Sequence, residues 1–349
     1  MFIINNMKTF LLTTLVLLSG FMSYGQVVGL DAFGMGDLVN IAINGAKGRE
    51  GTDAIGAGFH QRAPGTRCGF VADPFDTAWD PTGFNGDFFM PGSPENGWGI
   101  QIGGTDYGNN HDITEIPVDP GQAISHSVEG DCITIEWQGI VAGVTVNVKY
   151  HLITTDLFYT TEITMINNTG GDLTDLYYYR NVDPDNNQPL SGSYTTTNTI
   201  VSQPDDECQK SLVSAEQTTP HDSYLGFGAL GDKFRVSYHG FANRSASDIW
   251  DATGGLIGTV GSVEVMDQAI SLAYKTDLDD GDTSNFTFAV VLSEDALEGA
   301  FSALYYIDYS SIGGDGGGLI SQCSPTTDTA DYCQGNDITL TVDGPNADD

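Results

Sequence analysis

The stretch that decides the fold is Ile133 to Val182, which reads ITIEWQGIVAGVTVNVKYHLITTDLFYTTEITMINNTGGDLTDLYYYRNV. In its clearest part, Val144 to Ile153, apolar side chains occupy every second position and mostly polar ones lie between them. A period of two is typical of strands that bury one face and expose the other. The stretch therefore predicts a meander of antiparallel strands at Ile133–Trp137, Val144–Ile153, Phe158–Ile166 and Leu173–Val182.

The same alternation predicts further strands toward the C-terminal side, at Phe234–His239, Ala269–Lys275 and Asn285–Leu292. One helix is expected from about Asp295 to Tyr306, with Ser293 as its N-cap and acidic residues in its first turn. Its apolar positions repeat at the helical spacing of three and four residues. They are Leu297, Ala300, Phe301 and Leu304.

Before Asn110 the chain is rich in Gly, Asp, Asn and Pro, which break helices and favour turns. Short strands are expected near Leu38–Ile43, Gly69–Ala72 and Gly99–Ile102, joined by ordered loops. Five aromatic residues lie among these loops: Trp79, Phe84, Phe88, Phe89 and Trp98. Core packing is the favoured role for them, and a shallow sugar-stacking surface is the alternative.

The predicted fold class is mainly β, a large antiparallel two-sheet sandwich with one short helix near the C-terminal end. This β-sandwich domain is expected to span residues 26–311, with a subdivision near 110–120 as an alternative.

The two ends of the chain are expected to lie outside this domain. Residues 1–25 have the order of a secretory signal peptide, with Lys8, an apolar run from Phe10 to Met22, and then small or polar residues. A buried N-terminal strand or helix is the alternative. Residues 312–322 are interpreted as a Gly-rich linker. Residues 323–349 are interpreted as the truncated start of a following Ig-like β-repeat, so the protein is expected to continue.

The formal net charge is −35, from 47 acidic and 12 basic residues. Such a surface repels nucleic acid and anionic lipid, so neither is expected as a partner. An acidic surface can bind Ca²⁺ or cationic ligands, and a salty medium would screen its self-repulsion. A role in solubility alone would also explain the excess of acidic residues. No segment of the mature chain is apolar enough to span a bilayer. The expected location is therefore outside the cell, at the cell surface.

Two acidic loops are candidate Ca²⁺ sites, because Ca²⁺ prefers oxygen ligands at alternate positions of a loop. The first is NVDPDNNQP, with Asp183, Asp185 and Asn187, and an Asx-rich turn is the alternative there. The second is TDLDDGDTSN, with Asp277, Asp279 and Asp282, where a simple hairpin connection is the alternative. No other cofactor is indicated.

No catalytic motif stands out. The six histidines are scattered, and neither HExxH, GxSxG nor a P-loop is present. The five cysteines are Cys68, Cys132, Cys208, Cys323 and Cys333; they form no CxxC pair, and their disulfide connectivity stays open. No catalytic residue is therefore predicted.

Two resemblances follow from these motifs. The leader ending in SYGQ, the acidic body and the tail CSPTTDTADYCQGNDITLTVDGP resemble large secreted repeat proteins of gliding bacteria, of the adhesin or motility-associated type. The region from ITIEWQG to YYYRNVDPDNN resembles galactose-mutarotase-like supersandwich domains. That family's catalytic motif cannot be matched residue by residue here, so no catalytic position is carried over.

The favoured function is a non-catalytic adhesion or binding head of a larger repeat protein, with glycans or surface proteins as partners. The alternative is a secreted carbohydrate-active or sugar-binding domain, which would need acids and aromatics converging on a concave sheet face. A purely structural spacer is the third hypothesis.

Overall fold

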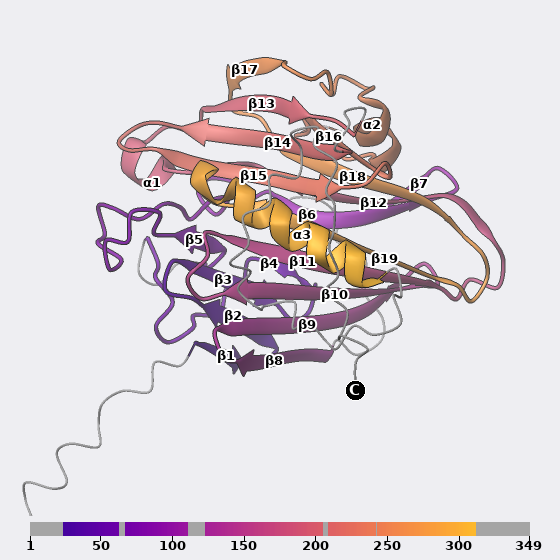
Figure 1. Ribbon diagram of the computed structural model, residues 1–349, viewed down its shortest axis with the longest axis horizontal. Helices are drawn as coiled ribbons and strands as arrows, with labels where there is room; N and C mark the ends of the chain where they lie inside the picture. Colours follow the sequence, from indigo (N-terminus) through magenta and orange to yellow (C-terminus); the bar gives the residue numbers. More distant parts are fainter. Residues whose placement is uncertain (1–23, 63–66, 111–122, 205–208, 242, 312–349) are drawn as a thin grey trace, which may run out of the picture.

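The computed structural model describes residues 24–62, 67–110, 123–204, 209–241 and 243–311, with the side chains of 123 and 306–311 excepted. The predicted signal peptide, linker and Ig-like repeat start lie almost wholly outside these residues. The mainly β, antiparallel sandwich is confirmed, and a third small sheet adds to it (Figure 1).

The largest sheet has nine antiparallel strands in the order β17-β13-β14-β15-β19-β11-β10-β9-β8. Its strands are β8 (Ala123–Glu129), β9 (Cys132–Val141), β10 (Val144–Ile153), β11 (Phe158–Asn167), β13 (Thr196–Ser202), β14 (Lys210–Gln217), β15 (Ser223–Leu230), β17 (Val263–Met266) and β19 (Thr283–Val291). Inward-facing residues of β9 and β10, such as Ile135 and Val148, are almost completely buried, as the alternation predicted.

Two smaller sheets cover the inner face of this large sheet. One has the order β16-β18-β12-β6-β7 and consists of β6 (Asn96–Ile102), β7 (Thr105–Asn110), β12 (Leu173–Val182), β16 (Phe234–Tyr238) and β18 (Ile270–Leu278). The other is formed by β1 (Gly25–Val28), β2 (Asp31–Met35), β3 (Val39–Asn44), β4 (Arg49–Glu50) and β5 (Phe70–Ala72). One hydrophobic core joins all three sheets.

The predicted meander is wrong at its last step. Strand β11 pairs with β19, whereas β12 crosses to the opposite sheet and pairs with β6 and β18. The residues of β12 from Leu176 onward are buried on both faces, and its three tyrosines and Arg180 pack between layers. Sequence alternation cannot identify the partner of a strand, because that partner is chosen by long-range packing.

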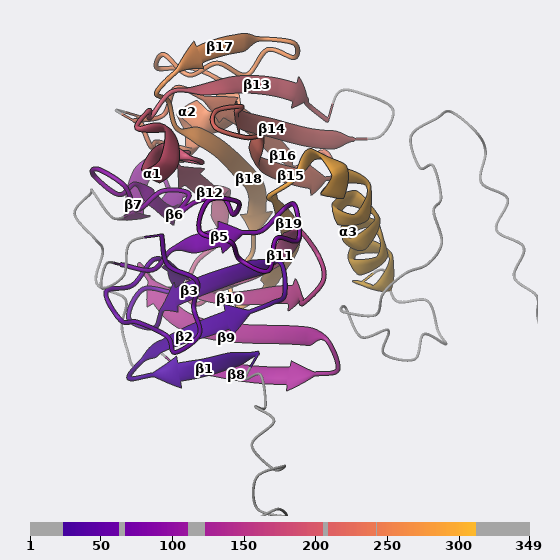
Figure 2. The same ribbon diagram turned by 90° about the vertical axis from the view of Figure 1, so that its left-hand side faces the viewer.

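Helix α3 (Leu297–Ser311) lies on the outer face of the large sheet, against β19, β15 and β11 (Figures 1 and 2). Ala300 and Leu304 are buried there, and Leu297 and Phe301 pack beside them, so the predicted apolar stripe is confirmed. The helix begins later than predicted, because a 3₁₀ turn at Glu294–Ala296 precedes it. Two short helices, α1 (Gln188–Ser191) and α2 (Ala246–Asp251), had no signal in the sequence.

The aromatic residues of the N-terminal loops pack into the core, as favoured. Phe84, Phe88, Phe89 and Trp98 are at most 3% exposed, and Trp79 packs against a smaller apolar cluster. The same hydrophobic core contains residues that precede and residues that follow 110–120, where the alternative subdivision was placed. Residues 111–120 themselves lie outside the described residues.

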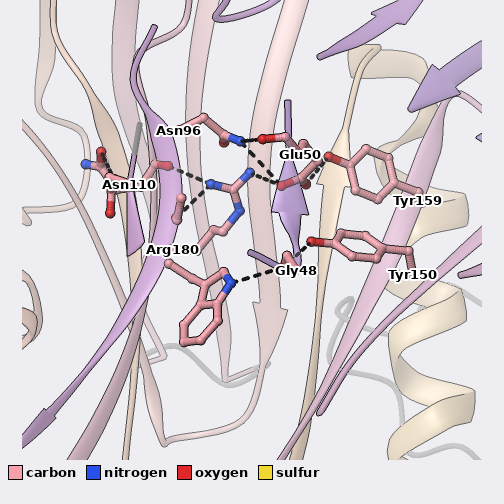
Figure 3. A network of polar contacts seen from close by, with 10 residues as sticks. Gly48, Glu50, Asn96, Asn110, Tyr150, Tyr159 and Arg180 are labelled. Atoms are coloured by element: carbon pink, nitrogen blue, oxygen red, sulfur yellow. Dashed lines mark hydrogen bonds and ion pairs between the residues drawn. The ribbon is translucent and has the colours of Figure 1, made fainter. Parts of the chain in front are cut away.

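A buried ion pair ties the sheets together (Figure 3). The Arg180 guanidinium lies 2.9 Å from Glu50 Oε2, and its other terminal nitrogen donates to the Gly97 carbonyl. The Tyr159 hydroxyl donates to Glu50 Oε1 at 2.7 Å, and Tyr150 donates to the Gly48 carbonyl. These bonds satisfy charges that would otherwise destabilise the core.

Candidate functional site

The candidate site lies at the end of the sandwich where β5, the loop after it and α1 meet (Figure 1). Backbone hydrogen bonds hold these segments together: Asp185 N–H donates to the Phe88 carbonyl, and Gly86 N–H donates to the Asn186 carbonyl. A cavity of about 700 Å³ opens here. Its walls come from Asp53, Arg62, Arg67, Asp87, Met90, Pro91, Gly92, Pro94, Gln188 and Pro189.

Arg62 is the most constrained polar group of this cavity. Its Nε donates to the Gly86 carbonyl at 2.8 Å, Nη1 donates to the Pro81 carbonyl, and its guanidinium carbon lies 3.8 Å from the centre of the Phe84 ring. Burial lowers its pKa to about 10, against the opposing effect of Asp80, so it stays cationic at neutral pH. Among the described residues, its buried Nη2 has no hydrogen-bond acceptor.

Asp87 follows Gly86 and places a carboxyl group in the same wall. Oδ2 accepts a 2.6 Å hydrogen bond from Gly69 N–H, whereas Oδ1 is buried without a donor among the described residues. Burial raises the pKa of this carboxyl to about 7, although backbone N–H groups oppose the shift. Within the described residues, the cavity wall therefore places a guanidinium N–H without an acceptor near a buried carboxyl group.

His221 and Phe75 lie near this end of the molecule. Burial lowers the pKa of His221, and the positive charge of Arg62 lowers it as well, against the opposing effect of Asp222. The Phe75 ring meets it edge-on at 5.6 Å and is 52% exposed. An exposed ring in this setting can stack on an apolar ligand face.

The first predicted Ca²⁺ loop adjoins the cavity. Asp183, Asp185 and Asn187 follow the end of β12 and are 8%, 1% and 0% exposed, respectively. Within the described ranges no three Asp, Glu, His or Cys side chains converge on one metal position, so a cation here would have at most two carboxylate ligands. Calcium at this loop stays a prediction and is taken up below.

The second predicted loop lies far from the first. Leu173 of β12 pairs with Leu278 and Val182 pairs with Ile270, so the two loops stand at opposite ends of β12, about 30 Å apart at the usual rise of a strand. The acidic run forms the β18–β19 hairpin: Asp277 Oδ1 accepts from Asp175 N–H, and Asp279 and Asp282 are exposed. These contacts account for the acidic run as a connection, and calcium there remains untested.

A second hollow, of about 350 Å³, lies on the outer face of the large sheet. Its polar groups face one another across strands: Lys149 lies 3.0 Å from Glu136, and Gln138 donates to Asn147. The one aromatic residue in its lining, Trp137, is only 2% exposed. Such cross-strand pairs stabilise a sheet and leave few groups for a ligand.

Sequence reasoning missed Arg62, Asp87 and Phe75. Each is a single residue in a Gly- and Asp-rich loop, without a motif or periodicity to mark it. His111, the one histidine that the sequence placed in a polar loop, lies outside the described residues. Cys68 is a free, buried thiol, and Cys132 is disulfide-bonded. None of the described helices is both long and apolar enough to cross a membrane.

No protein-family model matches this chain, and no curated protein matches its sequence. Solved structures match at low similarity. A heparan sulfate lyase from Pedobacter heparinus has 8% identity and a TM-score of 0.31, with 55% of this chain and 23% of that chain covered. A GH36 α-galactosidase from Geobacillus stearothermophilus has 11% identity and a TM-score of 0.33, with 82% and 42% covered.

An α-galactosidase from Lactobacillus brevis has 9% identity and a TM-score of 0.37, covering 79% of this chain and 41% of that one. The chain therefore spans less than half the length of each of these structures. These TM-scores are too low for the likeness to bear on function. What the molecule itself defines is an antiparallel β-sandwich with a polar cavity at one end.

Proposed function

We propose that this chain is the non-catalytic binding head of a larger secreted or cell-surface protein, and that its ligand is a glycan carrying an acidic group. The observation that carries the proposal is Arg62 Nη2, a buried cationic donor that has no acceptor within the described part of the chain, in a cavity of about 700 Å³. A guanidinium is well suited to bind a carboxylate or sulfate oxygen.

The charge of the whole protein sharpens this choice of ligand. The chain has only six arginines, and two of them, Arg62 and Arg67, line the cavity. Arg67 is half-exposed and pairs with Asp53 at 2.8 Å, so it can exchange that partner for a ligand at little cost. The two arginines therefore offer cationic donors to an anionic group that fits the cavity, beside Asp53 and Asp87 in the same lining.

The remaining walls suit a sugar ring. Met90, Pro91, Pro94 and Pro189 supply apolar surface, and the buried Asp87 carboxyl and the half-buried Gln188 supply polar groups. Binding sites for small ligands commonly combine apolar walls with a few fixed polar groups. The C–H face of a pyranose can pack on the prolines while its hydroxyl and acidic groups meet Arg62 and Asp87.

The test is calorimetric titration of the full chain with three oligosaccharides: an oligogalacturonate (carboxylate), a chondroitin sulfate oligosaccharide (sulfate and carboxylate) and cellohexaose (neutral). We expect saturable binding of at least one acidic ligand and weaker binding of cellohexaose. Arg62→Met should weaken binding about 10- to 100-fold, because a charge-assisted hydrogen bond contributes about 1.5–3 kcal/mol. The affinity of Arg62→Lys should lie between those of the parent and Arg62→Met, because lysine keeps the positive charge but lacks the planar guanidinium.

Two controls make the result decisive. Arg235→Met removes another arginine whose guanidinium lies over an aromatic ring, that of Trp250, and should leave binding unchanged. Arg67→Met tests the cavity through an exposed side chain whose loss does not threaten folding. Absence of binding to all three oligosaccharides would overturn the proposal, and so would binding by Arg62→Met and Arg67→Met that is as tight as binding by the parent. If new reducing ends are released from the bound glycan, the protein cleaves it, and the alternative function, a carbohydrate-active domain, would be correct.

A further inference from the structure

The segment from Asp183 to Asn187 is polar, rigid and buried. Its backbone is held from several sides: Asp183 N–H donates to the Glu95 carbonyl, Asp185 N–H to the Phe88 carbonyl, and Asn187 N–H to Gln217 Oε1. Asp185 is 1% exposed, and Asn186 and Asn187 are completely buried. A loop with so many polar side chains away from water needs partners for each of them.

The side-chain amide donors of Asn186 and Asn187 are satisfied, whereas buried acceptors of residues 185–187 are not. Asn186 Nδ2 donates to the carbonyls of Ala215 and Ser223, and Asn187 Nδ2 donates to the His221 carbonyl. Among the described residues, Asn186 Oδ1, Asn187 Oδ1 and both carboxylate oxygens of Asp185 are buried without a hydrogen-bond donor. Four such oxygens on three consecutive residues call for a shared positive partner, since each buried unpaired polar group costs about 1–3 kcal/mol.

The buried oxygens of Asp185 carry this need most strongly. The residue is 1% exposed, and neither carboxylate oxygen has a hydrogen-bond donor among the described residues. A cation bound between these oxygens and the neighbouring amide oxygens would satisfy all of them at once.

We propose that this segment binds one Ca²⁺, held by the carboxylates of Asp183 and Asp185 and by amide oxygens of Asn186 and Asn187. Two carboxylates together with neutral oxygens agree with the absence of a three-carboxylate centre in the described part of the chain. Carboxylate and amide oxygens in a loop suit Ca²⁺, and the lack of His and Cys in the set disfavours transition metals. Of the two loops singled out in the sequence, this is the one whose buried oxygens support the proposal, and the prediction for the β18–β19 hairpin stays open.

The bound ion would also brace the cavity. Asn186 accepts a hydrogen bond from Gly86 N–H through its carbonyl, and the Gly86 carbonyl accepts one from Arg62 Nε. The ion is therefore two hydrogen bonds away from the guanidinium of the cavity. The site itself does not rest on the proposed glycan function, because its evidence is the unpaired oxygens alone.

The experiment is titration of the EDTA-treated, dialysed full chain with CaCl₂ by calorimetry in 0.15 M NaCl, with MgCl₂ in a parallel run. The salt screens weak binding to the acidic surface. We expect one strong Ca²⁺ site per chain, much weaker Mg²⁺ binding, and a melting temperature that rises with CaCl₂ and falls with EDTA. Asp185→Asn should weaken the strong site roughly a hundredfold or more, because a charged ligand becomes neutral.

A matched variant and a folding check keep the proposal falsifiable. Asp279→Asn removes the same charge from the exposed hairpin and should leave the strong site intact. Metal-free Asp185→Asn should melt no lower than the metal-free parent, since it removes a buried carboxyl; this separates loss of binding from failure to fold. The absence of a strong Ca²⁺ site in the parent, or its survival in Asp185→Asn, would refute the site. Either result would leave the glycan titrations above standing.

Discussion

Glu50 and Arg180 show how strongly single buried residues can depend on one another. Their side chains are 1% and 3% exposed, and Glu50 also accepts hydrogen bonds from Tyr159 and Asn96. Neither residue carried a signal in the sequence, because a charged residue in a strand is normally assigned to the wet face. Here the Glu50 side chain of β4 meets the Arg180 side chain of β12, and the charges are buried as a pair.

Arg180→Met should lower the free energy of unfolding by about 3–5 kcal/mol, because it leaves the Glu50 carboxylate buried without its partner. Urea denaturation would measure this loss. The Lys149–Glu136 pair offers a matched control, since its side chains are 37% and 51% exposed and Lys149→Met should cost less than about 1 kcal/mol. The double variant Glu50→Gln/Arg180→Met should recover part of the stability. Equal losses for the buried and exposed pairs would contradict this account.

Asp156 should make stability depend on pH. It lies in the turn between β10 and β11, where burial raises the pKa of its carboxyl to about 6 and the nearby Asp131 carboxylate adds to the shift. The native state therefore holds this proton more tightly than the unfolded state. Its contribution to stability is present at low pH and is lost as the pH rises through about 6.

Asp156→Asn should accordingly be more stable than the parent at pH 7.5, by up to about 2 kcal/mol. The advantage should shrink steadily toward pH 5. Urea denaturation of both proteins between pH 5 and 8 would measure the difference and avoids the sequence pI near 4.1. A difference that stays constant over this range would exclude Asp156 as the titrating group.

At the level of elements, periodicity located most of the predicted strands. The predicted bounds of β10 and β12 match those observed, and β9, β11, β18 and β19 were found with shifts at their ends. Strands β14 and β15 were missed. Both are buried along most of their length, with β16 and β18 packed on one side and, for β15, helix α3 on the other. Burial on both faces weakens the alternation that marks a strand, although β12, buried on both faces from Leu176 onward, was still predicted.

Helix α3 gives a prediction at this scale. Leu304 is 3% exposed in the cluster that joins the helix to β11, β15 and β19. Leu304→Ala should lower the free energy of unfolding by about 2–4 kcal/mol, through lost burial and the cavity left behind. Val265→Ala, on the edge strand β17 where the side chain is 65% exposed, should change it by less than about 0.5 kcal/mol. Thermal or urea unfolding would compare the two, and a similar effect of both would mean that the helix is only loosely docked.

At the scale of the whole molecule, the large sheet is assembled from strands far apart in the chain. Strand β19 lies between β11 and β15, and the small N-terminal sheet packs beneath β8 and β9 (Figure 2). The same arrangement creates the candidate site, since its walls come from residues 53–94 and from α1. The distribution of charge is a second feature of the whole molecule. The formal net charge is −35, yet two of the six arginines line one cavity.

The sequence by itself determined the fold class, the positions of the alternating strands, the amphipathic helix near residue 300 and the acidic loop at Asp183–Asn187. These are local properties, set by side-chain periodicity, capping and turn chemistry over a few residues. Only the tertiary structure decided that β12 changes sheets, that Glu50 meets Arg180, and that Arg62 and Asp87 share a cavity. It also buried the loop at Asp183–Asn187 and exposed Asp279 and Asp282 of the β18–β19 hairpin. The physical reason is that burial and partner choice depend on contacts between residues distant in sequence, and no local pattern encodes them.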